Sequence, residues 1–128
     1  MPRVCAAYFA FGVVCVLIGM GWGMQMGASE DLAMAPAHAH LNLLGWVTMG
    51  LYGTFYTLTR DTMSVRLAWA NWIISALGVV ILIPTLALFL RHGNDPAYIP
   101  FLVAGEILTV LGMVVFGISV AKELLRNR

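Results

Sequence analysis

The chain has 128 residues, of which 61% are hydrophobic and only 10% are charged, and its formal net charge is +1. A soluble globular protein carries about 25% charged residues, and a chain this short has too little interior to hide so much apolar surface from water. The composition excludes an ordinary soluble domain, and the small net charge argues against a nucleic acid as partner. We expect one integral membrane domain over residues 1–128, with the lipid bilayer as its main solvent.

Four apolar segments approach or exceed the roughly 20 helical residues needed to cross a hydrocarbon core about 30 Å thick. They lie at residues 4–24, 39–58, 67–90 and 99–120. Backbone groups in lipid need hydrogen-bond partners within their own segment, so each segment is predicted to be a helix. The first resembles a signal peptide in having Arg3 before an apolar core. No convincing small-x-small cleavage site follows it, and we expect a retained helix.

The connections between the predicted helices contain residues typical of helix starts and turns. Pro36 suits the start of the second helix, where the N–H that proline lacks would have no partner in any case. Gly93, Asn94 and Pro96 favour a tight turn before the fourth helix. Short connections join antiparallel neighbours. The sequence therefore predicts an all-α, up-down bundle of four transmembrane helices.

The positive charges are unevenly distributed between the two sides of this bundle. Of the seven Lys and Arg residues, only Arg91 falls on the side of the first and third connections. Cytoplasmic segments are enriched in Lys and Arg. We therefore predict that both termini are cytoplasmic and that the protein lies in a bacterial inner membrane. The first and third connections would then be on the outer, periplasmic side.

All three histidines of the chain lie toward this predicted outer side. His38 and His40 are at the start of the second helix, in the segment PAHAHLNLLGWVTMGLYGTFY, and His92 follows the third helix. Imidazole is the commonest protein ligand for metals and an axial ligand of heme iron. Three imidazoles on one side of a chain with few polar residues indicate a binding site. The alternative is that they are interfacial histidines, solvated or hydrogen-bonded to the connections.

Helical geometry separates the two histidines of the second helix. Residues two apart on an α-helix differ by about 200° in direction, so His38 and His40 cannot both bind one ion unless the helix begins between them. The face of His38 is small and polar and suits hydrogen bonding or packing inside the bundle, because it carries Asn42, Gly45, Met49 and Tyr52. The face of His40 is apolar, as the edge of a porphyrin pocket would be, because it carries Leu43, Leu44, Val47 and Leu51.

Glu106 is the only charged residue well inside a predicted span, about 10 Å from the outer start of the fourth helix. A charge at the centre of a bilayer costs about 2.5–3.5 kcal/mol on insertion scales. We expect Glu106 to face the bundle interior, either protonated or paired with a group such as a histidine. It would act there as a proton carrier, a ligand or the partner of a ligand. A snorkelling carboxylate that is merely tolerated is the alternative.

Small residues mark the first predicted helix. Glycines at positions 19, 23 and 27 are four residues apart, with Gly21 between them. This spacing lets another helix, or a flat cofactor, approach the backbone closely. The glycines are compatible with ordinary helix packing, with a dimer contact and with a cofactor contact. Cys5 and Cys15 are about 15 Å apart along the same helix, too far for a disulfide within the chain. We expect both cysteines to be small apolar packing residues.

The segment His40-Leu41-Asn42-Leu43-Leu44-Gly45-Trp46 resembles the second membrane helix of the catalytic subunit of heme–copper oxidases, especially in the nitric oxide reductase branch. The longer string over residues 38–56 resembles small four-helix membrane proteins described as oxidase subunit I-like. This resemblance implies that His40 is an axial ligand of a heme.

The resemblance is confined to this segment, and the chain departs from the family elsewhere. It is far too short to build the copper-containing active site of a full oxidase subunit. In the small relatives the third helix carries further histidines, and Asn71 and Ser75 stand at the comparable positions here.

Three functions follow from these residues. The first is a heme b-binding membrane protein that transfers electrons or interacts with a small gas such as NO or O2. His40 would be one axial ligand, and the other would be His92, His38 or a residue of another copy. Arg91 would neutralise a heme propionate, and Asn42 would support the site.

The second function is a copper-binding membrane protein. Its nitrogen ligands would be His38, His40 and His92, and its sulfur ligands would be the methionines in or near the first connection, at positions 24, 26 and 34. The third is an accessory, structural subunit of a larger respiratory complex. A homodimer or another homo-oligomer is compatible with these functions. We expect no independent enzymatic activity, because the sequence contains no recognisable nucleophile–base pair, phosphate-binding loop or two-carboxylate site.

Overall fold

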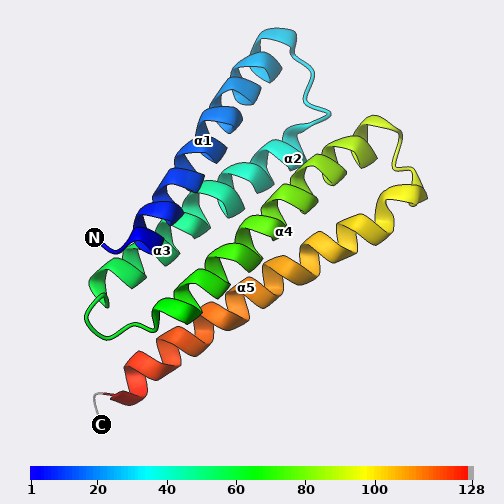
Figure 1. Ribbon diagram of the computed structural model, residues 1–128. Coiled ribbons are helices and arrows are strands. Elements are labelled where there is room, and N and C mark those ends of the chain that lie inside the picture. The colour runs from blue at the N-terminus through cyan, green and yellow to red at the C-terminus, as the bar shows by residue number, and fades with distance from the viewer. Residues whose placement is uncertain (127–128) are drawn as a thin grey trace.

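The computed structural model describes residues 1–126, and Arg128, one of the charges behind the predicted orientation, lies outside them. Four helical rods run up and down, as predicted, and no strand occurs among residues 1–126 (Figure 1). We term the second rod the composite helix, because three helical segments follow one another in it without a break. The elements are α1 (Arg3–Ser29), the composite helix formed by α2 (Ala35–His40), η1 (Leu41–Thr48) and α3 (Met49–Leu58), then α4 (Val65–Arg91), the single turn η2 (Pro96–Tyr98) and α5 (Ile99–Arg126).

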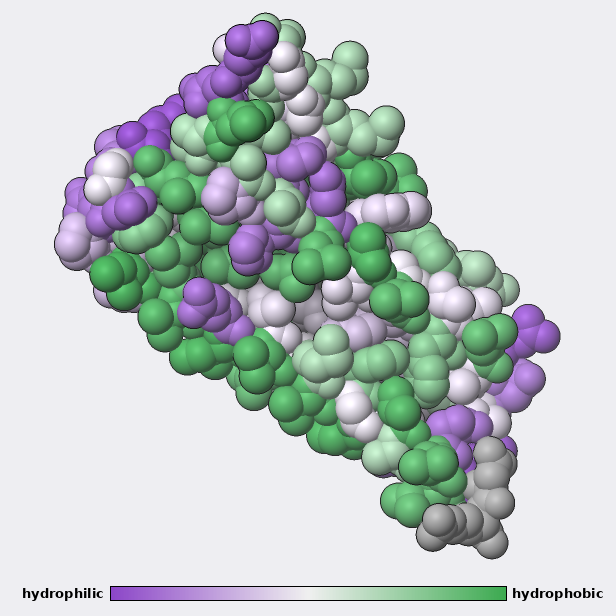
Figure 2. Space-filling view, turned by 180° about the vertical axis from the view of Figure 1, so that it is seen from behind, coloured by the Kyte–Doolittle hydropathy of each residue, from purple (hydrophilic) through white to green (hydrophobic). Residues whose placement is uncertain are grey.

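Three of these rods, α1, α4 and α5, are each long and apolar enough to cross a membrane. On the face seen in Figure 2, hydrophobic residues cover most of the middle, and hydrophilic residues gather mainly toward the two ends. The start of α1 and the end of α5 lie at one end of the bundle, which we call the terminal end (Figure 1). The connections that follow α1 and α4 lie at the opposite end, which we call the histidine end.

The helix ends follow the turn chemistry of the sequence. Ser64 caps α4 by accepting a hydrogen bond from the Leu67 N–H, and Asp95 caps η2 by accepting one from the Ala97 N–H. Between α4 and η2, Gly93 and Asn94 both have positive φ, 65° and 63°, a conformation that glycine and asparagine adopt most readily. The turn predicted between the third and fourth helices is confirmed.

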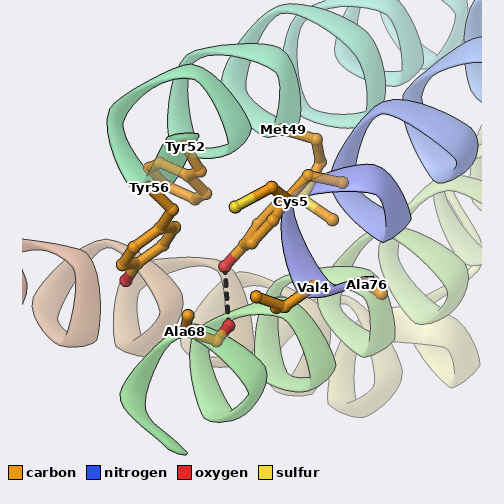
Figure 3. Close-up of a cluster of buried hydrophobic side chains, with 8 residues drawn as sticks. Val4, Cys5, Met49, Tyr52, Tyr56, Ala68 and Ala76 are labelled. Atoms are coloured by element: carbon orange, nitrogen blue, oxygen red, sulfur yellow. Dashed lines mark hydrogen bonds between the residues drawn. The ribbon is translucent and has the colours of Figure 1, made fainter. Parts of the chain in front are cut away.

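The core at the terminal end is built from aromatic and small side chains of α1, α3 and α4 (Figure 3). Tyr8 and Tyr56 are fully buried, and their rings stack with centroids 5.6 Å apart. The Tyr8 hydroxyl donates a hydrogen bond of 3.0 Å to the Ala68 carbonyl, which joins α1 to α4. Cys5 and Cys15 are buried and free, which confirms their predicted role in packing.

The hairpin of α4 and α5 is closely packed because glycines lie at its contact. A Cβ atom at Gly105 would lie 2.8 Å from the Leu82 Cα, and one at Gly78 would lie 3.0 Å from the Thr109 hydroxyl. Most other side chains of α5 are exposed, and its only buried residues are Gly105 and Gly112. The fourth rod therefore packs along a narrow strip and turns most of its apolar surface outward.

The segment η1 is a π-helix of eight residues that begins directly after His40. The Thr48 hydroxyl donates a hydrogen bond of 2.9 Å to the Leu43 carbonyl five residues earlier, in keeping with the wider helix. π-Helical turns are rare and occur frequently at functional sites. The π-helix was not predicted from the sequence, and it divides the predicted second helix.

Candidate functional site

His38 and Asn42 point from the composite helix toward α1. The Asn42 side-chain N–H donates to His38 Nε2 over 3.3 Å. A Cβ atom at Gly23 would lie 3.0 Å from His38 Cε1, and one at Gly19 would overlap the Asn42 amide oxygen. Gly19 and Gly23 therefore leave room for these two polar side chains, which confirms that small residues of α1 admit another helix. No atom lies within 4 Å of such a Cβ position at Gly21 or Gly27.

This interior pair carries polar atoms that have no partner among the described residues. His38 Nδ1 and the Asn42 amide oxygen are both buried without a hydrogen bond. A buried polar group left unpaired costs about 1–3 kcal/mol. The pair thus forms a polar position in an otherwise apolar contact between α1 and the composite helix.

His40 points the opposite way and is exposed on the outside of the bundle. Its Nδ1 lies 2.7 Å from the Pro36 carbonyl oxygen. Because a carbonyl only accepts hydrogen bonds, Nδ1 carries the proton, and Nε2 of the neutral ring keeps its lone pair. Of the apolar residues predicted on its face, Leu43 and Leu51 are exposed, to 58% and 63%. Leu44, also predicted there, is half-buried and packs against the core. The predicted separation of the two histidines into different environments is confirmed.

His92 lies in the turn beyond α4 and is exposed. Its Nδ1 lies 2.8 Å from the Leu88 carbonyl oxygen, and its ring centroid lies 5.6 Å from that of Tyr98. No group of three or more His, Cys, Asp or Glu residues able to hold a metal ion occurs within residues 1–126. The predicted copper ligands His38, His40 and His92 are therefore not gathered into one such group.

The prediction that Glu106 faces the interior is wrong, because its side chain is exposed on α5. Gly105, one residue earlier, is the position that contacts Leu82 of α4, and one residue along an α-helix turns the side chain by about 100°. Hydropathy predicts that a residue lies within a membrane span. The direction of its side chain depends on which residues of the helix pack against a neighbour, which on α5 are Gly105 and Gly112. Gly105 and Gly112, seven residues apart, are the sequence signal that marks this strip.

Asn71 and Ser75 belong to a buried hydrogen-bond network that joins three rods. The Ser75 hydroxyl donates to the Asn71 amide oxygen over 3.0 Å, and the Asn71 N–H donates to the Tyr56 hydroxyl over 3.3 Å. The Tyr56 and Ser119 hydroxyl oxygens are 2.9 Å apart and share a hydrogen bond. Where the resemblance leads us to expect imidazoles, this chain has hydroxyl and amide groups that hydrogen-bond to one another. Tyr56 and Ser119 were not predicted to belong to this network, because no local sequence pattern links them to Asn71.

Arg91 is exposed and lines an open cavity of about 570 Å³ between α1, the connection after it, and α4. None of the three histidines lines this cavity. The structure therefore places Arg91 at a cavity that His40 does not line.

Comparison with known proteins gave no match to a protein-family model, to a curated protein or to a solved structure.

Proposed function

We propose that this chain is a heme b-binding membrane protein in which His40 supplies an axial ligand through Nε2. The proposal is supported by the bond from His40 Nδ1 to the Pro36 carbonyl oxygen, 2.7 Å long. Metal-binding histidines commonly donate their second ring N–H to a backbone carbonyl, which fixes the tautomer, orients the ring and makes the ligating nitrogen more basic. His40 has this arrangement, and the resemblance of residues 40–46 to a heme-binding helix points to the same residue.

The surroundings of His40 fit a porphyrin. The exposed leucine and valine side chains beside it offer apolar contact for a flat ring, and the π-helical segment begins at the next residue. Heme held at His40 would supply one-electron chemistry or a binding position for NO or O2.

The second axial ligand comes from another copy of the chain in this proposal. His38 is turned toward α1 and cannot reach an iron bound on the opposite face. His40 lies on the outside of the bundle, so two copies related by a two-fold axis can present their His40 side chains to the same iron. Two histidine ligands favour electron transfer over gas binding.

The proposed orientation follows the charges. The composite helix would complete four membrane spans, with the terminal end in the cytoplasm and the histidine end on the periplasmic side of a bacterial inner membrane. Near the terminal end, Arg60 lies in the connection before α4, Arg66 in the first turn of α4 and Lys122 in the last turns of α5. Arg91 lies at the opposite end. This distribution favours cytoplasmic placement of the terminal end.

An absorption spectrum of the purified protein, oxidised and reduced, tests the heme proposal. We expect a Soret band in the wild type expressed with sufficient heme, its loss in His40→Ala, and its retention in His92→Ala as the matched control. A colourless wild type would favour an accessory subunit without a cofactor. An unchanged band in His40→Ala would refute the assignment of His40.

A further inference from the structure

Two cavities that share lining residues lie between α1 and α4 on the side of the histidine end. The first, which we call the mouth, has a volume of about 570 Å³ and is bordered by the last turns of both helices and the connection after α1. The second, which we call the slot, has a volume of about 350 Å³ and lies deeper between the same helices. Trp22, Pro84 and Ala87 line both cavities, so the mouth and the slot adjoin, and we call the two together the groove.

The mouth offers one positive and one negative side chain. Arg91 and Asp31 both line it, and both are exposed. The only salt bridge between side chains of residues 1–126 joins Arg60 to Asp61 elsewhere in the chain. Asp31 uses one carboxylate oxygen to accept a hydrogen bond of 3.0 Å from the Ala33 N–H. The Arg91 guanidinium and the other Asp31 oxygen are thus available to a ligand that carries both charges.

The slot is lined entirely by apolar side chains, among them Phe11, Val14, Ile18, Val79 and Ile83. From Phe11 to Trp22 it follows α1 for eleven residues, or about 16 Å at helical rise. Half of a hydrocarbon core about 30 Å thick is about 15 Å. The slot therefore matches in length the part of one acyl chain that lies within a single leaflet.

We propose that this groove binds a zwitterionic aminophospholipid, with its phosphate on Arg91, its ammonium group on Asp31 and one acyl chain in the slot. An anionic lipid without an amine meets the repulsion of Asp31. A choline lipid has no N–H to donate to the carboxylate. The ethanolamine head group satisfies both charged side chains, and charge-assisted hydrogen bonds are the stronger kind. This site shares no residue with the proposed heme site and does not depend on heme binding.

Native mass spectrometry of the full chain tests this proposal. The protein is released from nanodiscs that contain equal amounts of ethanolamine, choline and glycerol phospholipids with identical acyl chains. We expect the ethanolamine lipid to be retained about tenfold more than either competitor, the ratio given by one additional charge-assisted hydrogen bond. Arg91→Gln should weaken retention of all three lipids. Asp31→Asn should remove only the preference for ethanolamine. Arg60→Gln, at the terminal end, is the matched control and should leave retention unchanged.

A second pair of variants tests the slot. Ala87→Phe fills the groove and should reduce retention of every lipid. Leu77→Phe places the same side chain at an exposed position of α4 that does not line the groove, and should have no effect. Equal retention of the three lipids by the wild type would overturn the proposal, as would a preference for the glycerol lipid. The head-group variants change only exposed side chains, so the test does not rest on the folding of Ala87→Phe.

Discussion

Gly19→Ala is the sharpest test of how α1 meets the composite helix. The new methyl group would overlap the Asn42 amide oxygen, and overpacking of a close contact typically costs about 1–3 kcal/mol. Alanine also improves the helix itself by up to about 1 kcal/mol. Gly21→Ala gains the same stability from the higher helix propensity of alanine on the same helix, but its methyl group meets no atom of residues 1–126 within 4 Å. The difference between the two variants in free energy of unfolding therefore isolates the contact, and we expect Gly19→Ala to be less stable by about 1–3 kcal/mol.

The assay is equilibrium unfolding in mixed detergent micelles, followed by circular dichroism. Asn42→Ala, alone and combined with Gly19→Ala, completes a double-mutant cycle. Because Asn42→Ala removes the atom that the new methyl group meets, Gly19→Ala should cost much less in that background, with a coupling energy of about 1 kcal/mol or more. Equal stabilities of Gly19→Ala and Gly21→Ala, or a coupling energy near zero, would refute the contact between Gly19 and Asn42.

The remaining predictions concern the buried network, Glu106 and the orientation. Asn71→Ala removes the central group of the network and should lower the free energy of unfolding by about 1–2 kcal/mol. The control Thr54→Ala loses only a hydrogen bond to the Gly50 carbonyl on its own helix, and it should change the free energy of unfolding by less than about 0.5 kcal/mol. Glu106→Leu should make insertion of α5 more favourable by about 2–3 kcal/mol in a translocon assay, without loss of folded protein; unfolding of this variant would show that the carboxylate has an essential partner. Alkaline phosphatase fused after residue 126 should be inactive, and the same enzyme inserted at Gly93 should be active; the reverse pattern would invert the proposed orientation.

The all-helical fold was largely predictable because hydropathy reports directly on it. Four apolar segments and short connections were sufficient to predict four rods in up-down order, and the structure extends their ends by several residues. The opposite directions of His38 and His40 were also predictable, since the rise and rotation of a helix depend on no other part of the chain.

What the sequence could not predict depends on contacts between rods. Glu106 was placed on the wrong side because the packing strip of α5 is set by its glycines and not by hydropathy. The π-helix after His40 has no recognised sequence signature, and its apolar residues read equally well as an α-helix. The hydrogen bond from Asn71 to Tyr56 spans 15 positions of the sequence, and the bond between Tyr56 and Ser119 spans 63. No local sequence pattern predicts such distant partners.

The role of His40 as an iron ligand can be measured most directly by chemical rescue. His40→Gly removes the imidazole side chain and leaves space for a free imidazole. Titration with imidazole then tests whether the free molecule can replace the missing ligand. We predict that purified His40→Gly binds added heme weakly, and that imidazole restores a wild-type Soret band. Heme binding by His40→Gly equal to that of the wild type in the absence of imidazole would contradict the assignment of His40 as the axial ligand.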